Sequence, residues 1–393
     1  MRILFLSFYY EPDLSAGSFR SAALVKALAE RLGQGDCIEV LTTQPNRYQS
    51  FSRGTPAVEL SPGLQIRRFQ LPVHRSGFLD QSRAFAAYAW QVFRFVRGRQ
   101  YDLVFATSSR LMTAFLGALV SRWKHVPLYL DIRDIFVDTI QDVLSPWSAR
   151  ALLPAFQAVE GFTMRRAARI NLVSEGFRTY FEQRYPGKSY GFVPNGIDEE
   201  FLDFDFAPAE KKSGTRLVVL YAGNVGEGQG LHRIVPGLAA LTRATHEFWI
   251  VGDGGARGKL EAAVEGLENV KIMPPMDRNA LLSLYRQSDI LFLHLNDYPA
   301  FRRVLPSKLF EYAATGKPVL AGVSGHAAEF LSRLPSVAVF APCDLQAGLA
   351  ALISLEIEPV SRKDFVKAFR RTRLMRLLAT DILAGAQAGR GGD

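Results

Sequence analysis

Cysteine and long apolar runs are both scarce in this chain. Its 393 residues include two cysteines, Cys37 and Cys343, which stand far apart and have no histidine or cysteine neighbours at ligand spacing. This pattern excludes a disulfide framework and gives no sign of a structural zinc site. The longest apolar run beyond the N-terminus, residues 111–120, is about half of what crosses a bilayer. We therefore expect no membrane-spanning helix.

The first apolar run also lacks the features of a signal peptide. Residues 3–10 lead directly into Glu11, Pro12 and Asp13, with no cleavage site of small residues. This run therefore predicts a first β-strand. The low cysteine content fits a reducing compartment, so we expect a cytoplasmic protein.

Acidic residues are too few to balance the basic ones. The chain has 47 Lys and Arg against 38 Asp and Glu, a net charge of +9. Up to Asp198 there are 24 basic and 16 acidic residues, which places +8 of the charge in the first half. Such an excess attracts nucleic acid, phosphorylated ligands or anionic lipid. No zinc-finger, RNA-recognition or helix-turn-helix signature accompanies it, so we expect no nucleic-acid partner.

Length and periodicity predict an α/β fold with two domains. Short apolar runs alternate with segments of helical period, which is typical of doubly wound parallel sheets in Rossmann-like domains facing each other across a cleft. The predicted strands are residues 3–8, 37–42, 103–107, 128–131 and 170–173, and then 217–222, 246–251, 270–273, 290–293 and 319–321. Because Pro194 and the Asn195–Gly196 pair break regular structure, we predict domains at residues 1–194 and 215–361 with a linker at 195–214.

Two glycine-rich loops follow the strands at 217–222 and 246–251. Their glycine and polar positions are Gly223, Asn224, Gly226, Gly252, Asp253 and Gly254. Glycine lets the backbone approach a phosphate, and a helix N-terminus stabilises the phosphate charge. A tight turn without any ligand would produce the same pattern in a single loop.

A third candidate segment begins at Pro306, which suits the first turn of a helix. Ser307 and Lys308 would then lie at its positively polarised N-terminus, with Glu311 one turn along. This spacing pairs a phosphate site with a carboxylate that can grip a ribose diol. The alternatives are a solvated charge at Lys308 and a helix-face ion pair at Glu311.

The segments 252–255, 270–273 and 308–319 together resemble the C-terminal domain of retaining glycosyltransferases of the GT-B fold, family GT4. Residues 221–226 with 306–308, and 131–134 with 195–198, resemble the branch that transfers amino sugars such as N-acetyl-L-fucosamine in O-antigen and capsule assembly. The resemblance implies a UDP-sugar donor, a polyprenyl-diphosphate-linked saccharide acceptor, and neither cofactor nor metal ion. It also implies a final helix, at about 362–385, that returns to the first domain.

The resemblance also suggests roles for individual residues. In the resemblance, Arg303 and Lys308 would stabilise the leaving group. Glu311 would bind the ribose, and Met273 would border the base. Arg133, Asp134 and the loop of Gly17 would line the side of the site where the reaction takes place. Three positions depart from the broader family, which has glutamate where Arg303 stands, lysine near Gln229 and histidine where Arg133 stands. Arg233 is a weaker candidate for binding the diphosphate.

Several alternatives stay open at this point. Arg133 could form a buried ion pair with Asp131 or Asp134, and Ser15 or Ser18 could simply cap a helix beside Gly17. A UDP-sugar 2-epimerase of the same fold and a non-catalytic nucleotide-sugar-binding homologue are the competing functions. A dinucleotide oxidoreductase is disfavoured, because no Gly-x-Gly-x-x-Gly follows the first strand.

Residues 82–99 have helical period with two contrasting faces. Phe85, Tyr88, Val92 and Val96 share one face, and Arg83, Trp90, Arg94 and Arg97 share the other. The apolar face could pack on the protein's own core. Tryptophan and arginine suit the headgroup layer of an anionic membrane, so we expect peripheral binding to the inner face of the bacterial plasma membrane.

Overall fold

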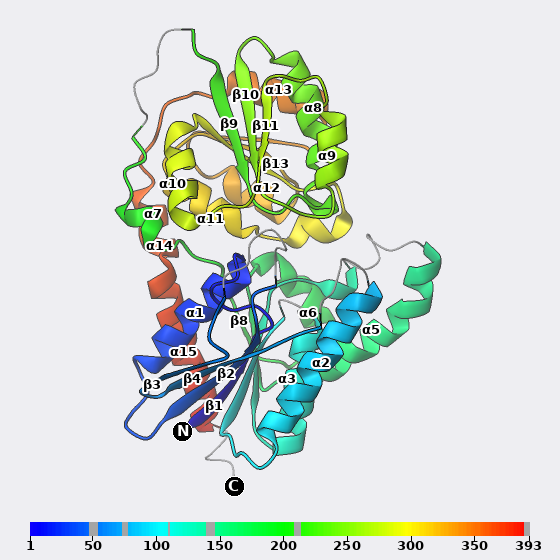
Figure 1. The fold of residues 1–393 in the computed structure, drawn as a ribbon, viewed down its shortest axis with the longest axis vertical. Coiled ribbons are helices and arrows are strands. Elements are labelled where there is room, and N and C mark those ends of the chain that lie inside the picture. The colour runs from blue at the N-terminus through cyan, green and yellow to red at the C-terminus, as the bar shows by residue number, and fades with distance from the viewer. Residues whose placement is uncertain (47–53, 73–77, 109–110, 139–145, 208–213, 389–393) are drawn as a thin grey trace. The chain divides into compact units, whose positions relative to one another are not determined.

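The chain forms two compact units in the computed structural model (Figure 1), which describes residues 1–46, 54–72, 78–108, 111–138, 146–207 and 214–388. Unit 1 comprises residues 1–195 and 371–393, and unit 2 comprises residues 196–370. Both units are α/β, as the sequence predicts.

Unit 1 contains an eight-stranded sheet in the order β3-β4-β2-β1-β5-β6-β7-β8. Its strands are β1 Arg2–Leu6, β2 Cys37–Thr43, β3 Val58–Ser61, β4 Leu64–Phe69, β5 Leu103–Thr107, β6 Leu128–Ile132, β7 Arg169–Leu172 and β8 Tyr190–Gly191. Only β3 pairs antiparallel. The helices around it are α1 Ala16–Ala29, α2 Phe78–Val96, α3 Leu111–Lys124, α5 Pro146–Arg166, α6 Arg178–Arg184 and α15 Arg371–Ala388. Helix α1 packs on α15, while α3 packs on α2 and α5.

Unit 2 contains a six-stranded parallel sheet in the order β11-β10-β9-β12-β13-β14. Its strands are β9 Leu217–Ala222, β10 His246–Val251, β11 Val270–Met273, β12 Ile290–His294, β13 Val319–Gly322 and β14 Val337–Phe340. Its helices are α7 Glu200–Asp203, α8 Leu231–Leu241, α9 Arg257–Ala263, α10 Arg278–Gln287, α11 Ser307–Ala314, α12 His326–Leu331, α13 Leu345–Ser354 and α14 Lys363–Phe369, with 3-10 turns η2 Glu227–Gln229 and η3 Pro299–Arg303.

Successive side chains of β9 enter two separate cores in unit 2. Leu220 and Ala222 lie in one apolar cluster, and Val219 and Tyr221 lie in the other. Because neighbouring strand residues point to opposite faces, the sheet is buried on both sides. This explains why its strands are nearly continuous apolar runs in the sequence.

The segment expected to be a linker at residues 195–214 differs from that expectation. It contains α7, and both Phe201 and Phe206 are buried in the core of unit 2. Burial of large aromatic side chains lowers the free energy of the folded chain, so this segment packs on unit 2. Residues 208–213 lie outside the described residues.

The C-terminal segment expected at 362–385 is divided between the units. Arg362 is buried in unit 2, where its guanidinium donates to the carbonyl oxygens of Pro335 at 2.7 Å and Lys317 at 3.1 Å. Helix α14 also belongs to unit 2, and the return to unit 1 begins at Arg371. Arg371 is buried too, whereas the other basic residues of this segment, Lys363, Lys367, Arg370, Arg373 and Arg376, are exposed.

Candidate functional site

Backbone contacts between glycines join the loops after β9 and β10 in unit 2. The Gly223 N–H donates to the Val251 carbonyl at 2.8 Å, and the Gly252 N–H donates to the Met273 carbonyl at 3.0 Å. A Cβ atom on Gly252, whose φ is 146°, would lie 1.8 Å from the Gly223 carbonyl oxygen. A Cβ atom on Gly254 would lie 2.6 Å from the Val225 carbonyl oxygen. Only glycine fits this close approach of two loops.

The side chains of Asn224 and Gln229 shape the first of these loops. Asn224 Nδ2 donates to Gln229 Oε1 at 2.8 Å, and the Gly226 N–H donates to the same oxygen at 3.2 Å. Gln229 stands near the position where the broader family has lysine, and here it organises the loop. In the second loop, Asp253 Oδ1 accepts from the Gly254 N–H at 2.8 Å. The six predicted loop residues therefore form one cluster.

Asn296, just after β12, supports the same loop and was missed by the sequence reasoning. Its backbone N–H donates to the Gly228 carbonyl at 2.8 Å, and its Nδ2 donates to the Glu227 carbonyl at 3.0 Å. Its Oδ1 accepts from Arg233 Nη1 at 2.7 Å. Arg233 is thus bound to the residue that supports the loop, and its role in binding the diphosphate stays a prediction.

His294, the last residue of β12, is fully buried and was also missed. Its Nδ1 lies 2.6 Å from the Gln229 carbonyl oxygen, and its Nε2 accepts from the Cys343 N–H at 3.1 Å. Only the neutral imidazole with its proton on Nδ1 satisfies both partners. Burial lowers the pKa of His294 to about 4, so the ring stays neutral near pH 7. His294 closes the apolar run at 290–293, and this polar residue at the end of a buried strand was the available sequence signal.

Helix α11 places Lys308 beside the first glycine loop. The Lys308 Cε lies 3.6 Å from where a Cβ on Gly223 would stand. Its Nζ donates to Glu311 Oε2 at 3.0 Å, and Arg278 Nη1 lies 4.0 Å from the other oxygen of Glu311. Burial works to lower the pKa of Lys308, but the Glu311 carboxylate outweighs it, so the pKa is raised and Lys308 is a cation at neutral pH. The ion pair that was the alternative for Glu311 is therefore present.

The other predicted residues of unit 2 flank this cluster. Pro306 is the extended N-cap of α11, and Ser307 is its first residue, which directs the first N–H groups of the helix outward. Met273 ends β11 and is half-buried. Arg303 ends η3, also half-buried, and its predicted role stays a prediction.

In unit 1, Asp131 is paired with Arg20 and not with Arg133. Arg20 Nε and Nη2 donate to the two oxygens of Asp131, both at 2.9 Å, and Asn171 Nδ2 donates to Oδ1 at 2.8 Å. Burial alone would raise the pKa of Asp131, but Arg20 holds it below its usual value. Arg133 instead donates from Nη2 to Asn195 Oδ1 at 3.4 Å, and its backbone N–H donates to Ser108 Oγ at 2.8 Å. Arg20 was the residue that sequence reasoning missed here.

Gly17 lies in the first turn of α1 and is buried. Ser15 is the N-cap, and its Oγ accepts from the Ser18 N–H at 3.1 Å. The capping alternative for this loop is therefore present. Asp134 is exposed.

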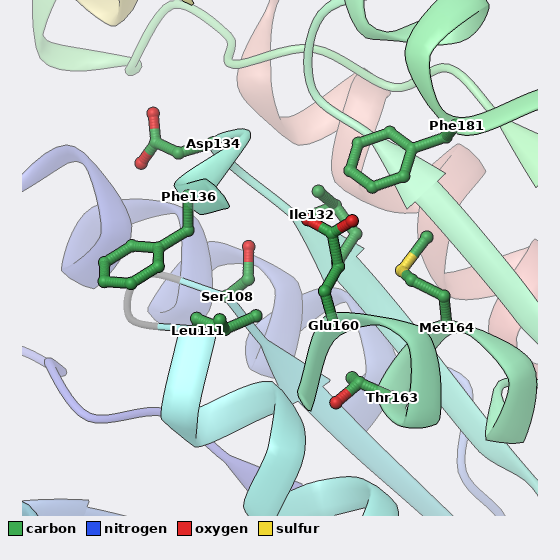
Figure 2. A pocket seen from close by; sticks show the side chains of 9 residues that line it. All are labelled: Ser108, Leu111, Ile132, Asp134, Phe136, Glu160, Thr163, Met164 and Phe181. Atoms are coloured by element: carbon green, nitrogen blue, oxygen red, sulfur yellow. The ribbon is translucent and has the colours of Figure 1, made fainter. Parts of the chain in front are cut away.

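A small pocket lies at the carboxyl ends of β5 and β6 in unit 1. Figure 2 shows Ser108, Asp134 and Glu160 among its lining residues. Its volume is about 10 Å³, which admits about one water molecule and no sugar. Glu160 is buried, which raises its pKa, and it accepts from the Tyr185 hydroxyl at 2.9 Å. We assign Glu160 to internal packing.

Helix α2 has the two faces that the sequence predicts. Tyr88, Val92 and Val96 are fully buried, whereas Arg83, Trp90, Arg94 and Arg97 are exposed. The Arg94 guanidinium lies 4.6 Å from the centre of the Trp90 ring, and the exposed Trp123 of α3 contacts Phe93 of α2 with ring centres 5.9 Å apart. Among the described helices, none combines the length and apolar character needed to cross a bilayer. Across the described residues, no group of three or more histidine, cysteine or acidic side chains could hold a metal ion.

Comparisons with known protein families agree with this arrangement. Residues 18–196 match the glycosyl transferase 4-like domain, and residues 216–356 match glycosyl transferases group 1. The chain therefore belongs to the GT-B glycosyltransferases, with one of these two domains in each unit.

Individual relatives and solved structures are more distant. A putative colanic acid biosynthesis glycosyl transferase, WcaI, of Escherichia coli K12 is 31% identical over 160 residues, which is 40% of this chain and 36% of WcaI. The crystal structure of WaaG, a glycosyltransferase involved in lipopolysaccharide biosynthesis, superposes with a TM-score of 0.64 at 17% identity and covers 99% of this chain and 100% of WaaG. HepE from Anabaena, solved in complex with UDP-glucose, gives 0.62 at 17% identity, over 100% of this chain and 98% of HepE. These structures show a shared fold.

Replacing Gly252 by alanine should destabilise unit 2. The added Cβ would meet the Gly223 carbonyl oxygen at 1.8 Å, so the two loops must separate, and we expect a loss of roughly 3 kcal/mol or more in the free energy of unfolding. Gly255→Ala is the matched control, because no atom lies within 4 Å of its Cβ position. Urea titrations of both variants measure the difference, and equal stabilities would contradict this account.

The buried His294 should make stability fall in acid. Its pKa is lowered from 6.5 to about 4 in the folded protein, so between these values the unfolded chain takes up a proton that the folded chain refuses. The stabilisation is complete above about pH 6.5 and declines as the pH falls toward 4, by on the order of 3 kcal/mol. Urea unfolding at a series of pH values measures this slope. His294→Gln should flatten it and the control His326→Gln should not; an unchanged slope in His294→Gln would refute the assignment.

Proposed function

We propose that this chain transfers a sugar from a UDP-sugar to an acceptor, with unit 2 binding the donor and unit 1 the acceptor. The observation that carries the proposal is the position of Lys308, a cation in the first turn of α11 beside the backbone of the first glycine loop. A diphosphate needs such a cation together with backbone N–H groups. HepE, solved with UDP-glucose, supports UDP as the carrier.

Departure of UDP is the step that these residues would assist. Negative charge develops on the leaving diphosphate, and fixed cations and N–H dipoles stabilise it without reorganising. Lys308 and the N–H groups after Pro306 supply this stabilisation, and Arg303 is a second candidate cation. On donor binding, Glu311 would accept hydrogen bonds from the ribose hydroxyls in place of part of its interaction with Lys308. Met273 would border the base. No metal ion takes part in this scheme.

We further propose that the transferred sugar is an N-acetylated amino sugar such as N-acetyl-L-fucosamine, moved with retention to a polyprenyl-diphosphate-linked saccharide during assembly of a bacterial surface polysaccharide. The partial similarity to the colanic acid transferase WcaI supports a role in such a pathway. Product analysis separates this activity from that of the UDP-sugar 2-epimerase alternative. A glycosylated lipid supports the transferase, a free epimer supports the epimerase, and the absence of any product supports a binding-only homologue.

Lys308→Ala should lower turnover by ~10²-fold or more, as expected for the loss of a group that stabilises the leaving diphosphate. Initial rates of UDP release with saturating donor measure the effect. Lys271→Ala is the control, because that exposed lysine lies on β11 and pairs with Glu247. EDTA should leave the wild-type rate unchanged. Near-wild-type UDP release by Lys308→Ala would remove Lys308 from the mechanism.

The outer face of α2 is proposed to bind the anionic inner surface of the plasma membrane. Exposed arginines flank Trp90, and an open hollow between α2 and the segment after β4 adds Arg67 and Phe95. The Arg67 guanidinium lies 4.8 Å from the Phe95 ring centre. Such pairing of aromatic and basic side chains suits phospholipid headgroups.

Reversing the charge of Arg83, Arg94 and Arg97 to glutamate should weaken binding to vesicles that contain phosphatidylglycerol. Each arginine near such a surface contributes about 1 kcal/mol, so co-sedimentation should fall by roughly tenfold or more at low salt. Binding to neutral vesicles is the control for nonspecific adsorption. Undiminished binding of the triple variant would exclude α2 as the membrane-facing element.

A further inference from the structure

Two buried arginines of unit 1, Arg20 and Arg371, act electrostatically on the half-buried Arg133. Arg20 and Arg371 are 1% and 2% exposed, and Asp131 is 2% exposed. Arg20 and Asp131 neutralise each other in the bidentate pair described above. Arg133 stands outside this pair. Its Nη1 is buried and has no hydrogen-bond partner within the part of the chain that the structure describes.

Among the described residues, the hydrogen-bond donors of the Arg133 guanidinium are only partly satisfied. Over the described ranges, the side-chain hydrogen bond of Arg133 goes to Asn195 Oδ1 and is long, at 3.4 Å. Burial lowers the pKa of Arg133 to about 10; Asp131 and Asp134 work against this fall, whereas Arg20 and Arg371 reinforce it. The group is still a cation at neutral pH. A desolvated cation with an unmet donor is costly unless a ligand completes it.

Arg133 also lies where a parallel sheet binds ligands. It directly follows β6, and its backbone is tied to Ser108 after β5, so it stands at the carboxyl edge of the sheet. Arg20 fixes the same edge by donating to the Val193 carbonyl at 2.8 Å and the Pro194 carbonyl at 2.6 Å. The hydrogen bonds of Arg20 to Asp131, Val193 and Pro194 therefore hold this edge of the sheet in place without any contribution from Arg133.

We propose that Arg133 forms an anion seat in unit 1, which binds one phosphate or carboxylate group of the acceptor. The inference rests on the proposed function, because it defines the class of acceptor as anionic. A guanidinium matches the geometry of both groups through paired N–H donors. The diphosphate of a lipid-linked saccharide and the carboxylate of an acidic sugar share this chemistry.

Binding of two probe anions distinguishes these sources. Inorganic pyrophosphate and glucuronate, with glucose as the neutral control, are titrated into the full chain by calorimetry at constant ionic strength. Binding of either anion to the wild type should weaken by roughly tenfold or more in Arg133→Gln. The loss caused by Arg133→Gln should also appear in the Lys308→Ala background, where the donor site does not contribute, and binding should persist in Arg31→Gln, an exposed control on unit 1. Pyrophosphate binding identifies a phosphate ligand, and glucuronate binding identifies a carboxylate.

The thermal stability of the unliganded variants provides a second readout. Arg133→Gln removes a half-buried charge whose Nη1 group is buried without a partner among the described residues, so its Tm should equal or exceed that of the wild type. Arg20→Gln breaks the pair with Asp131, so its Tm should fall. A lower Tm for Arg133→Gln, or anion binding that this variant leaves intact, overturns the seat. Neither measurement uses a UDP-sugar, so failure of the seat and failure of the transferase proposal are seen separately.

Discussion

In both units the strands at the centre of the sheet pair in parallel, and this brings their carboxyl ends and the loops that follow to one edge of each sheet. In unit 2 that edge carries Gly223, Gly252 and His294 from three strands that are distant in sequence. In unit 1 it carries Ser108 and Arg133. Neither cluster would form if one strand shifted its register, because each loop is anchored by backbone bonds that continue the pairing of the strands.

The ten strands predicted from apolar runs are all present, and most of them are buried on both faces, which leaves an uninterrupted apolar signal. The strands that were not predicted lie at or near sheet edges, where this signal fades. Strand β4 carries Arg67 and Arg68 among its apolar residues, and β8 has two residues. The linker was misjudged because Phe201 and Phe206 stand among charged residues, and only the folded unit shows that they are buried.

The glycine loops and Lys308 were found because their residue types are restricted by sterics or charge. Their supports were not found, since Asn296 and His294 act through bonds to Glu227, Gly228 and Gln229, over 60 residues earlier in the chain. Asp131 illustrates the same limit. The nearest arginine in sequence, Arg133, is not its hydrogen-bonding partner, and the actual partner, Arg20, lies 111 residues away. The local spacing of residues thus predicts which residue types form a site, but it does not predict which charged residues pair across a sheet.

Unit 1 is built from two separate stretches of chain, and its helix α15 follows the whole of unit 2 in the sequence. Tyr129 donates to Asp381 at 2.6 Å across 252 residues, and α15 covers α1. Unit 2 is continuous in sequence and can therefore complete its core first during synthesis, whereas the sheet of unit 1 lacks its helix α15 until later. Its apolar surface then depends on late, long-range closure, which is slow because of the large loop involved. Completion of unit 1 therefore follows synthesis of the whole of unit 2.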